Sequence, residues 1–458
     1  MIRMLLALTA LVSPAMAMAK AGPADVAQAK EVLMKGIGFP TVEGRGQTVA
    51  YAHYIASVLK AAGYADSEVV VTPMEGTATL EATLKGTTPG AKPIVLLAHM
   101  DVVEAKPADW TRDPFVAVEE GGYIFGRGAE DNKYDLSMMV VAMARLKAAG
   151  FRPKRDIVLV LTGDEETRMV TTQALAQKYR NAEIVLNGDG GGGTLGEDGT
   201  TALYYGLQAG EKTYADYAIE LTDVGGHSST PTDGNPIYRM ARILARIDAY
   251  DFPDQANELT RASLKARSGR IGGAVGDAMR RYAENPNDKA AAAVIAARPE
   301  FVGQIRTTCV ATEIDGGHAR NALPQRATAN INCRIFPGVP VEAVRATLAE
   351  LAGKDASVKT IDEPVASDAS PLRGDVVGAV TTAVRARYPG LDIIPSMSGG
   401  ATDSFYFRVL GVPSYGVASL FMRDADGFAH GLNERAPVAG IGGALDQWDS
   451  VLRTLGGK

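Results

Sequence analysis

The sequence predicts an α/β protein, in which a larger domain with a mainly parallel sheet is interrupted by a smaller α+β domain. Two patterns support this fold class. In residues 20–209 and 366–458, unbroken apolar runs of strand length alternate with helical periodicity, which is typical of a parallel sheet covered by helices. In residues 210–365 polar and apolar positions alternate instead, as in an antiparallel sheet with one exposed face. At 458 residues, the chain is long enough for two such domains.

The N-terminus has the three parts of a secretory signal peptide, which we place at residues 1–19. Arg3 is a short positive region, residues 4–12 form an apolar core, and two small-x-small sites end at Ala17 and Ala19. The apolar core is too short to remain as a membrane span, and no later segment is long and apolar enough to be one. We therefore expect a soluble, exported protein, located in a bacterial periplasm.

Composition and charge describe an ordinary soluble globular protein and exclude some partners. Hydrophobic residues make up 46% of the chain and charged residues 22%. The 47 basic and 53 acidic side chains give a net charge of −6, and the sequence contains no long basic run. We therefore expect neither nucleic acid nor an anionic membrane as a partner.

The elements of the larger domain follow from their periodicity. Helices are expected within residues 24–36, 48–63, 134–150 and 375–390. Buried strands are expected within residues 92–103, 156–166, 181–193 and 412–420. Ligands of parallel α/β sheets bind beyond the carboxyl ends of the strands, so polar residues at these ends are the first candidates for a site.

The smaller domain has a different pattern. Alternating strands are expected within residues 213–222, 307–314 and 326–336, and amphipathic helices within residues 235–250 and 341–353. The stretch 251–300 is polar and alanine-rich, which indicates extra helices or an insertion, and we assign it no role. After residue 366 the chain returns to apolar runs that alternate with helical periodicity, as in the first domain. We therefore expect the second domain to be inserted into the first.

The chain has two cysteines, Cys309 and Cys333, on either side of a predicted hairpin. An exported protein can form a disulfide, and the nearly symmetric placement would let the two residues face each other. Two buried free thiols explain the same pattern equally well.

Ionisable side chains gather at the predicted strand ends. His99 and Asp101 end the first strand, and because they are two residues apart they share a face. The second strand ends in three consecutive carboxylates, Asp164, Glu165 and Glu166. Like charges so close together repel, and burial increases the cost, so this arrangement indicates a bound cation.

Asp131, Asp189 and His430 complete the set. Asp131 lies in a glycine-flanked loop before a helix, Asp189 ends the third strand, and His430 lies near the C-terminus. Taken alone, Asp131 is better explained as a helix N-cap, and a strand-end histidine is more often structural. The ordered set is more specific than any one member.

Together, His99, Asp131, Glu166, Asp189 and His430 offer two imidazoles and three carboxylates. This set suits two zinc ions, each with one histidine, one terminal carboxylate and a share of a bridging carboxylate. Cobalt or manganese would suit the same ligands. Such a site needs a general base, and the remaining acid of the Glu165–Glu166 pair can serve.

The motifs HMDVV, GRGAEDNK, DEE and HGLNER, with Trp110 and residues 113–115, resemble a family of dizinc metallopeptidases. The family includes aminoacylase, glutamate carboxypeptidase, acetylornithine deacetylase and succinyl-diaminopimelate desuccinylase. The likeness extends over about residues 40–440, and the long 250–300 stretch is similar to the carboxypeptidase S branch. It implies a zinc-hydrolase catalytic domain in residues 20–209 and 366–458, and an inserted lid and dimerisation domain in residues 210–365.

The resemblance also implies how the ligands divide. His99, Asp189 and the bridging Asp131 would hold one zinc ion, and Glu166, His430 and the same Asp131 would hold the other.

The resemblance implies catalytic roles for three more residues. Asp101 would orient His99, and Glu165 would be the general base. His227, in the motif GGHSSTPTDG, would stabilise the oxyanion, often from the partner subunit of a homodimer. Without the resemblance, His227 is better explained as a loop residue that caps a turn.

Four residues would bind the carboxylate of the substrate by the same likeness: Asn321, Arg334, Gly399 and Gly400. An arginine suits this task because its planar fork matches a carboxylate. On their own, Asn321 could be a turn residue and Arg334 a solvated side chain on a strand.

We therefore expect an exported dizinc hydrolase that cleaves the amide bond before a residue with a free carboxylate. Its substrates would be dipeptides, short peptide C-termini or N-acyl amino acids. Two alternatives stay open at this point: a zinc aminopeptidase, which shares the metal-ligand order but lacks the inserted domain, and a non-catalytic periplasmic peptide-binding protein.

Overall fold

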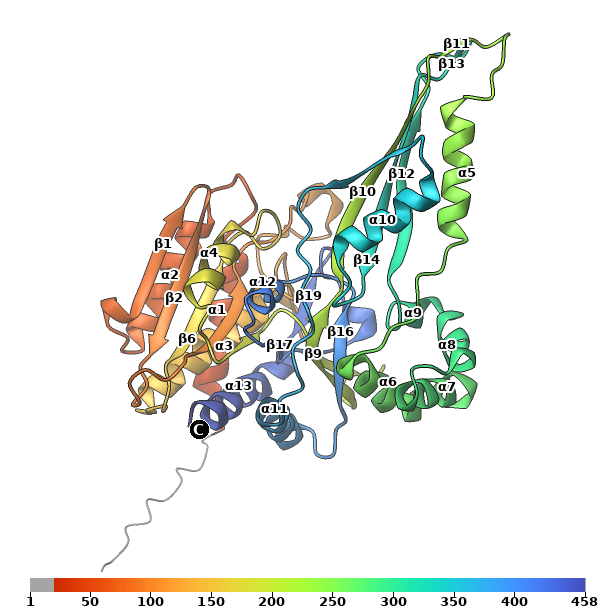
Figure 1. Cartoon of the computed structure of the whole chain (residues 1–458). Coiled ribbons are helices and arrows are strands. Elements are labelled where there is room, and N and C mark those ends of the chain that lie inside the picture. The colour runs from red at the N-terminus through yellow and green to blue at the C-terminus, as the bar shows by residue number, and fades with distance from the viewer. Residues whose placement is uncertain (1–19, 458) are drawn as a thin grey trace, which may run out of the picture.

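The computed structural model describes residues 20–457, so the predicted signal peptide at residues 1–19 lies outside the described residues. Figure 1 shows a large sheet flanked by helices and an antiparallel sheet that projects from it as an arm. Over the described range, no helix combines the length and hydrophobicity needed to cross a bilayer. The mixed α/β architecture with a parallel central sheet confirms the predicted fold class.

The large sheet has the strand order β1-β2-β6-β3-β7-β17-β9-β8-β18, and β16 pairs with β9. Its centre is parallel and consists of β6 (Ile157–Thr162), β3 (Ile94–His99), β7 (Ile184–Asn187) and β17 (Ser414–Gly416). These four strands are buried along their whole length, which explains their unbroken apolar runs. The other strands are β1 (Val69–Met74), β2 (Thr77–Leu84), β8 (Gly192–Leu195), β9 (Ala202–Glu211), β16 (Ile393–Ser398) and β18 (Phe421–Arg423).

Helices cover both faces of the large sheet. Leu96 of β3 packs into the core on one face, whereas Val95 and Leu97 pack into the core on the other. The first face is covered by α1 (Pro23–Ile37), α2 (Thr48–Ala61), α3 (Lys133–Ala148), α11 (Gly374–Arg387) and α13 (Ile441–Gly456). The second is covered by α4 (Val170–Lys178) and α12 (Ser404–Val409). A separate sheet joins β4 (Val118–Glu120), β5 (Tyr123–Phe125) and β19 (Arg435–Pro437).

The arm is an antiparallel sheet in the order β12-β14-β10-β15. Its strands are β10 (Thr213–Thr222), β12 (Thr308–Gly316), β14 (Arg326–Ile335) and β15 (Ser357–Ile361). One face packs against α5 (Pro236–Asp248) and α10 (Val341–Ala352), and the other bears Tyr214, Asp216 and Arg334. At the far end of the arm, β11 (Gly226–His227) pairs with β13 (Ala322–Leu323), as Figure 1 shows.

The stretch that we could assign no role forms helices with a small core of their own. These are α6 (Glu258–Ile271), α7 (Gly273–Glu284), α8 (Lys289–Ala296) and α9 (Pro299–Val302). They lie beside β16 and β9 of the large sheet (Figure 1). Leu259 belongs to the core of that sheet, and Arg270 donates a hydrogen bond of 2.7 Å to the carbonyl of Leu203 in β9. This helical segment lies within the range predicted for the lid domain. In the structure it therefore packs against the large sheet.

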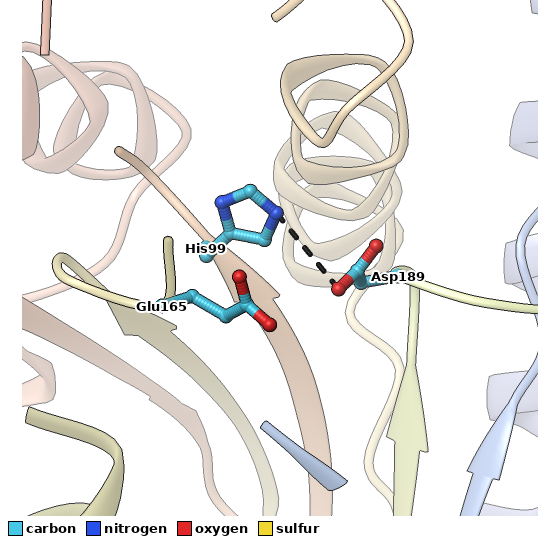
Figure 2. A group of neighbouring side chains, drawn as sticks. All are labelled: His99, Glu165 and Asp189. Carbon is cyan, nitrogen blue, oxygen red and sulfur yellow. Dashed lines mark ion pairs between the residues drawn. The ribbon is translucent and has the colours of Figure 1, made fainter. Parts of the chain in front are cut away.

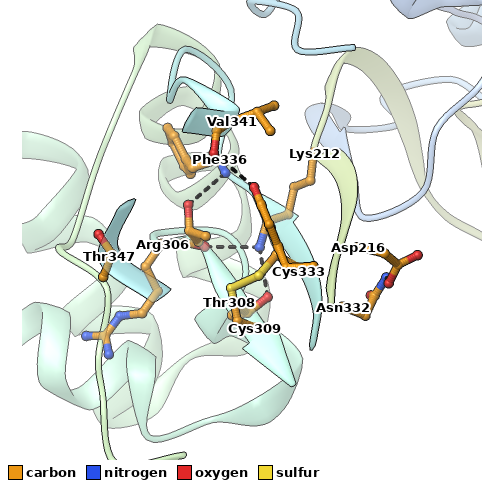
Figure 3. Close-up of a disulfide and its surroundings, with 12 residues drawn as sticks. Lys212, Asp216, Arg306, Thr308, Cys309, Asn332, Cys333, Phe336, Val341 and Thr347 are labelled. Atoms are coloured by element: carbon orange, nitrogen blue, oxygen red, sulfur yellow. Dashed lines mark hydrogen bonds between the residues drawn. A yellow bond between two sulfur atoms is a disulfide. The ribbon is translucent and has the colours of Figure 1, made fainter. Parts of the chain in front are cut away.

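A disulfide joins Cys309 of β12 to Cys333 of β14, which lie directly opposite each other in the arm (Figure 3). The structure thus favours the first of the two alternatives that the sequence left open. Beside it, the buried Lys212 amine donates hydrogen bonds to the Arg306 carbonyl at 3.0 Å and the Thr308 hydroxyl at 3.2 Å. These bonds tie the start of the arm to the strand that returns from the helical segment.

Candidate metal centre and active site

The carboxyl ends of the central strands bring the predicted ligands together. His99 ends β3, Glu165 and Glu166 follow β6, and Asp189 follows β7. Figure 2 shows the side chains of His99, Glu165 and Asp189 converging from these three neighbouring strands. This convergence is expected, because adjacent parallel strands end at the same edge of a sheet.

Asp131 lies between the two histidines. One carboxylate oxygen is 2.9 Å from Nε2 of His99, and the other is 3.3 Å from Nε2 of His430. Glu166 lies 2.9 Å from the same His430 nitrogen, and Asp189 lies 3.8 Å from Nε2 of His99. A carboxylate with one oxygen toward each histidine has the placement that a bridging ligand needs.

The donor set fits two divalent cations. His99, Glu165 and Asp189 form one group of potential ligand atoms, all within 4.8 Å of one another, and His99, Asp131 and Glu166 form a second. Together these groups put four carboxylates next to His99 in a largely buried space. Divalent cations would compensate this charge, and imidazole with carboxylate ligands suits zinc, cobalt or manganese.

The pKa values of these side chains also reflect their burial and the repulsion among the neighbouring carboxylates. Burial raises the pKa of Glu165 and of Asp189 well above the usual range, and the neighbouring carboxylates add to the effect. Burial alone would lower the pKa of His99, but hydrogen bonds to Asp101 and Asp131 raise it well above its usual value. Hydrogen bonds to Asp131 and Glu166 raise the pKa of His430 to about 10. The site therefore binds protons strongly when no other cation neutralises it.

Asp101 contacts His99, and its carboxylate also has backbone partners. Its backbone carbonyl is 3.0 Å from Nδ1 of His99, whereas its carboxylate is 3.6 Å from that atom. The same carboxylate accepts the backbone N–H groups of Glu165 at 3.1 Å and Glu166 at 3.0 Å. Asp101 thus fixes the backbone that presents both glutamates.

Asp164, the third acid of the triplet, has a structural partner. Its buried carboxylate accepts the backbone N–H groups of Val170 at 2.8 Å and Thr171 at 3.0 Å, together with the Thr171 hydroxyl. These are the first N–H groups of α4, which have no partner inside the helix. Asp164 therefore anchors the start of α4 and does not belong to the ligand set.

Sequence reasoning missed Glu434, which holds the loop that carries Asp131. Its buried carboxylate accepts the backbone N–H groups of Gly128 at 3.0 Å, Glu130 at 2.8 Å and Asp131 at 3.0 Å. It also pairs with the buried guanidinium of Arg127 at 2.7 Å. The motif HGLNER had drawn attention only to its histidine, although the glutamate lies in the same stretch.

Replacing Glu434 by alanine is expected to lower the free energy of unfolding by about 3–5 kcal/mol, because it leaves the Arg127 charge buried and unpaired. Urea unfolding measures this change, and metal analysis should show weaker metal retention by the same variant. The matched control is Glu350→Ala, an exposed glutamate on α10 whose loss should change stability by less than about 0.5 kcal/mol. Equal stability of the two variants would contradict the anchoring role.

Asp403 is a second residue that sequence reasoning missed. Its buried carboxylate accepts hydrogen bonds from the hydroxyls of Thr162, at 2.6 Å, and Thr172. Burial raises its pKa to about 6. The residue links the glycine-rich loop at 399–403 to the strand end that carries Glu165.

Arg334 and the loop of Gly399 and Gly400, which are predicted to bind the substrate carboxylate, are in contact. The Arg334 guanidinium donates a hydrogen bond of 2.8 Å to the carbonyl of Gly399 and lies 4.6 Å from the ring centroid of Tyr214. Gly400 follows in the same exposed loop, where its N–H is bonded to the Ser398 hydroxyl at 3.0 Å.

His227 and Asn321, the other residues predicted to contact the substrate, lie away from this loop. His227 and Asn321 are at the far end of the arm, in and beside the β11–β13 pair (Figure 1). The Ser228 N–H donates to the Asn321 carbonyl at 3.0 Å, and His227 is exposed, with Nδ1 2.8 Å from the Ser229 hydroxyl. Within one chain, these two residues are close to each other but are not part of the metal centre.

Comparison with known proteins finds similar sequences among named hydrolases. The mouse N-fatty-acyl-amino acid synthase/hydrolase PM20D1 is 25% identical over 375 residues, which cover 78% of this chain and 73% of the mouse protein. Carboxypeptidase S of Saccharomyces cerevisiae is 29% identical over 276 residues, covering 55% of this chain and 46% of the yeast protein.

The M20 family metallo-carboxypeptidase Sso-CP2 of Sulfolobus solfataricus has the same fold, with a TM-score of 0.69 and 19% identity. The match covers 93% of this chain and 98% of that protein. Residues 95–453 match the sequence pattern of peptidase family M20/M25/M40. The fold, the cluster of potential metal ligands and this match over most of the chain lead to one conclusion: the protein belongs to peptidase family M20/M25/M40.

Proposed function

We propose that the protein is an exported dizinc hydrolase that cleaves the amide bond before a residue with a free carboxylate. The observation that carries the proposal is Asp131 between His99 and His430, with Glu166 and Asp189 on either side. The names of the relatives, a carboxypeptidase and an N-fatty-acyl-amino acid synthase/hydrolase, support substrates of this class.

Each group of the protein has a defined task in such a reaction. When bound, the metal ions supply Lewis acidity to the scissile carbonyl and to the attacking water. Glu165, whose carboxylate lies beside His99 and Asp189, takes a proton from that water and passes it to the leaving nitrogen as a general base. Arg334, beside the loop of Gly399 and Gly400, binds the substrate carboxylate and sets the position of the amide.

Export is supported by the N-terminal sequence pattern and by the Cys309–Cys333 disulfide. Disulfides persist in oxidising compartments such as the bacterial periplasm and are rare in the cytosol.

The position of His227 supports a homodimer in which the partner completes each active site. The far end of one arm would bring the partner subunit's His227 and the partner subunit's Asn321 to the substrate. The arm also has an exposed edge strand, β12, on which Val310 and Ile314 are exposed. Exposed apolar side chains on an open sheet edge are typical of a surface that pairs with another chain.

A complementation experiment tests this arrangement. The Glu165→Ala and His227→Ala variants should each be nearly inactive, whereas subunit exchange between them should restore about a quarter of wild-type activity. The recovery arises because random exchange converts half of all dimers into heterodimers, and in each heterodimer one of the two sites has both functional residues. As a control, each variant alone is taken through the same exchange procedure. If the mixture is no more active than either variant alone, the partner subunit does not contribute His227 to the site.

Substrate end-groups test the reaction class. C-terminal amidation of a dipeptide should abolish hydrolysis, because it removes the carboxylate that Arg334 would bind, whereas N-acetylation should be tolerated. The measurement is product release, followed by mass spectrometry on the same sample for which zinc content is determined. A zinc aminopeptidase would show the opposite pattern, and binding without product release would indicate a non-catalytic peptide-binding protein.

A further inference from the structure

A cavity of about 330 Å³ lies between the arm and the large-sheet domain. Three segments form its walls: residues 167–169 after Glu166, the open arm face at Tyr214 and Asp216, and residues 361–365 where the chain leaves the arm. Phe405 and Tyr406 of α12 also line the cavity. Cavities of roughly 300 Å³ and more are large enough to hold part of a small ligand.

This cavity adjoins both groups that would fix the C-terminal residue of a substrate. Tyr214 lines it and stacks on Arg334, the proposed carboxylate ligand, while Thr167 lines it next to the predicted metal ligand Glu166. Ala401, which follows Gly399 and Gly400, lines it as well. The carbon that bears the substrate carboxylate is bonded to the leaving nitrogen, so its side chain must project between these two anchors.

The lining is largely apolar and aromatic. Met169, Pro364 and Val365 line the cavity together with Phe405 and Tyr406, whose ring centroids are 4.2 Å apart. Phe405 is half-buried and lies outside the apolar clusters formed by the described residues. Its ring therefore remains available to pack against a ligand.

The charges around the cavity are mainly negative. Asp216, Asp362 and Glu363 line it, against Arg168, which lies 3.5 Å from Glu43. Two further charged groups line the wall: Glu211 pairs with the buried Arg408 at 2.8 Å, and the Lys212 amine donates hydrogen bonds to the Arg306 carbonyl and the Thr308 hydroxyl. An acidic side chain would therefore be repelled.

We propose that this cavity receives the side chain of the substrate's C-terminal residue and selects large aromatic or aliphatic side chains over acidic ones. The inference rests on the proposed function, since it assigns a subsite to the same reaction.

The test compares N-acetyl amino acids and alanyl dipeptides that differ only in a C-terminal Phe, Gly or Glu. For the wild-type protein, kcat/KM should be at least about tenfold higher with Phe than with Gly, and lowest with Glu. Phe405→Ala should lower the Phe-to-Gly ratio about tenfold, because it removes most of the aromatic wall. Glu363→Lys, on the exposed rim, should raise the Glu-to-Gly ratio several-fold at low ionic strength.

The matched control is Glu350→Lys, which makes the same charge change on the exposed surface of α10 and should leave both ratios unchanged. A wild-type preference for Glu, or ratios that neither Phe405→Ala nor Glu363→Lys alters, would overturn the assignment of the cavity. Absence of hydrolysis with every member of both series, with zinc bound, would instead refute the proposed function, so the two failures are distinguishable.

Discussion

Replacing Glu165 by alanine is expected to lower kcat about a thousandfold or more while the protein retains about two zinc ions per chain. The reason is that Glu165 is the proposed general base, whereas the other two acids of the Asp164–Glu166 triplet have other partners. Asp164 binds the start of α4, and Glu166 lies against His430. Turnover of a dipeptide or an N-acyl amino acid and metal analysis of the same preparation measure the two quantities.

Metal content is the decisive control, because the side chain of Glu165 also lies near His99 and Asp189 at the spacing of a ligand group (Figure 2). A variant that loses one zinc ion together with its activity would identify Glu165 as a ligand. Wild-type activity in Glu165→Ala would show that the base assignment is wrong. Glu165→Gln, which keeps the shape and removes the proton-accepting carboxylate, should be as inactive as the alanine variant.

Removing the metal should abolish activity, and zinc binding to the metal-free protein at pH 7 should release about two protons or more per chain. The pKa of His430 is raised to about 10 and that of His99 well above its usual value, so both rings hold protons at pH 7 that zinc must displace. The raised pKa values of Glu165 and Asp189 act in the same direction. Zinc affinity should therefore increase with pH through the neutral range.

Calorimetric titration in buffers with different ionisation enthalpies measures the number of protons released. The Glu350→Ala variant, which changes no group near the site, should release the same number as the wild-type protein. Zinc binding without proton release, or an affinity independent of pH, would show that the histidines are neutral before the metal arrives.

Much of the candidate site could be predicted because its residues have strong local signals. His99, the glutamate pair and Asp189 each follow an apolar strand, and adjacent parallel strands necessarily end at one edge. The partners of these residues could not be predicted in the same way. Glu434 binds a loop 304 residues away in sequence, and only the completed fold brings the two together.

The arm shows a second limit of sequence reasoning. The alternation of polar and apolar positions predicts its strands, and the structure has β10, β12 and β14 where the pattern places them. How far the arm extends depends on the register of those strands and on the short β11–β13 pair, which have no comparable signal. The distance of His227 from the candidate metal centre of its own chain therefore appears only in the folded chain.

The order of strands in the large sheet has a consequence for how the protein is made. β17, at residues 414–416, lies between β7 and β9, although both of those strands emerge from the ribosome some two hundred residues earlier. Until β17 has been synthesised, β7 has an unpaired edge, and such an edge is prone to pair with other chains. The large sheet can be completed only near the end of synthesis. A chain that stops before residue 414 should therefore aggregate instead of forming a smaller folded hydrolase.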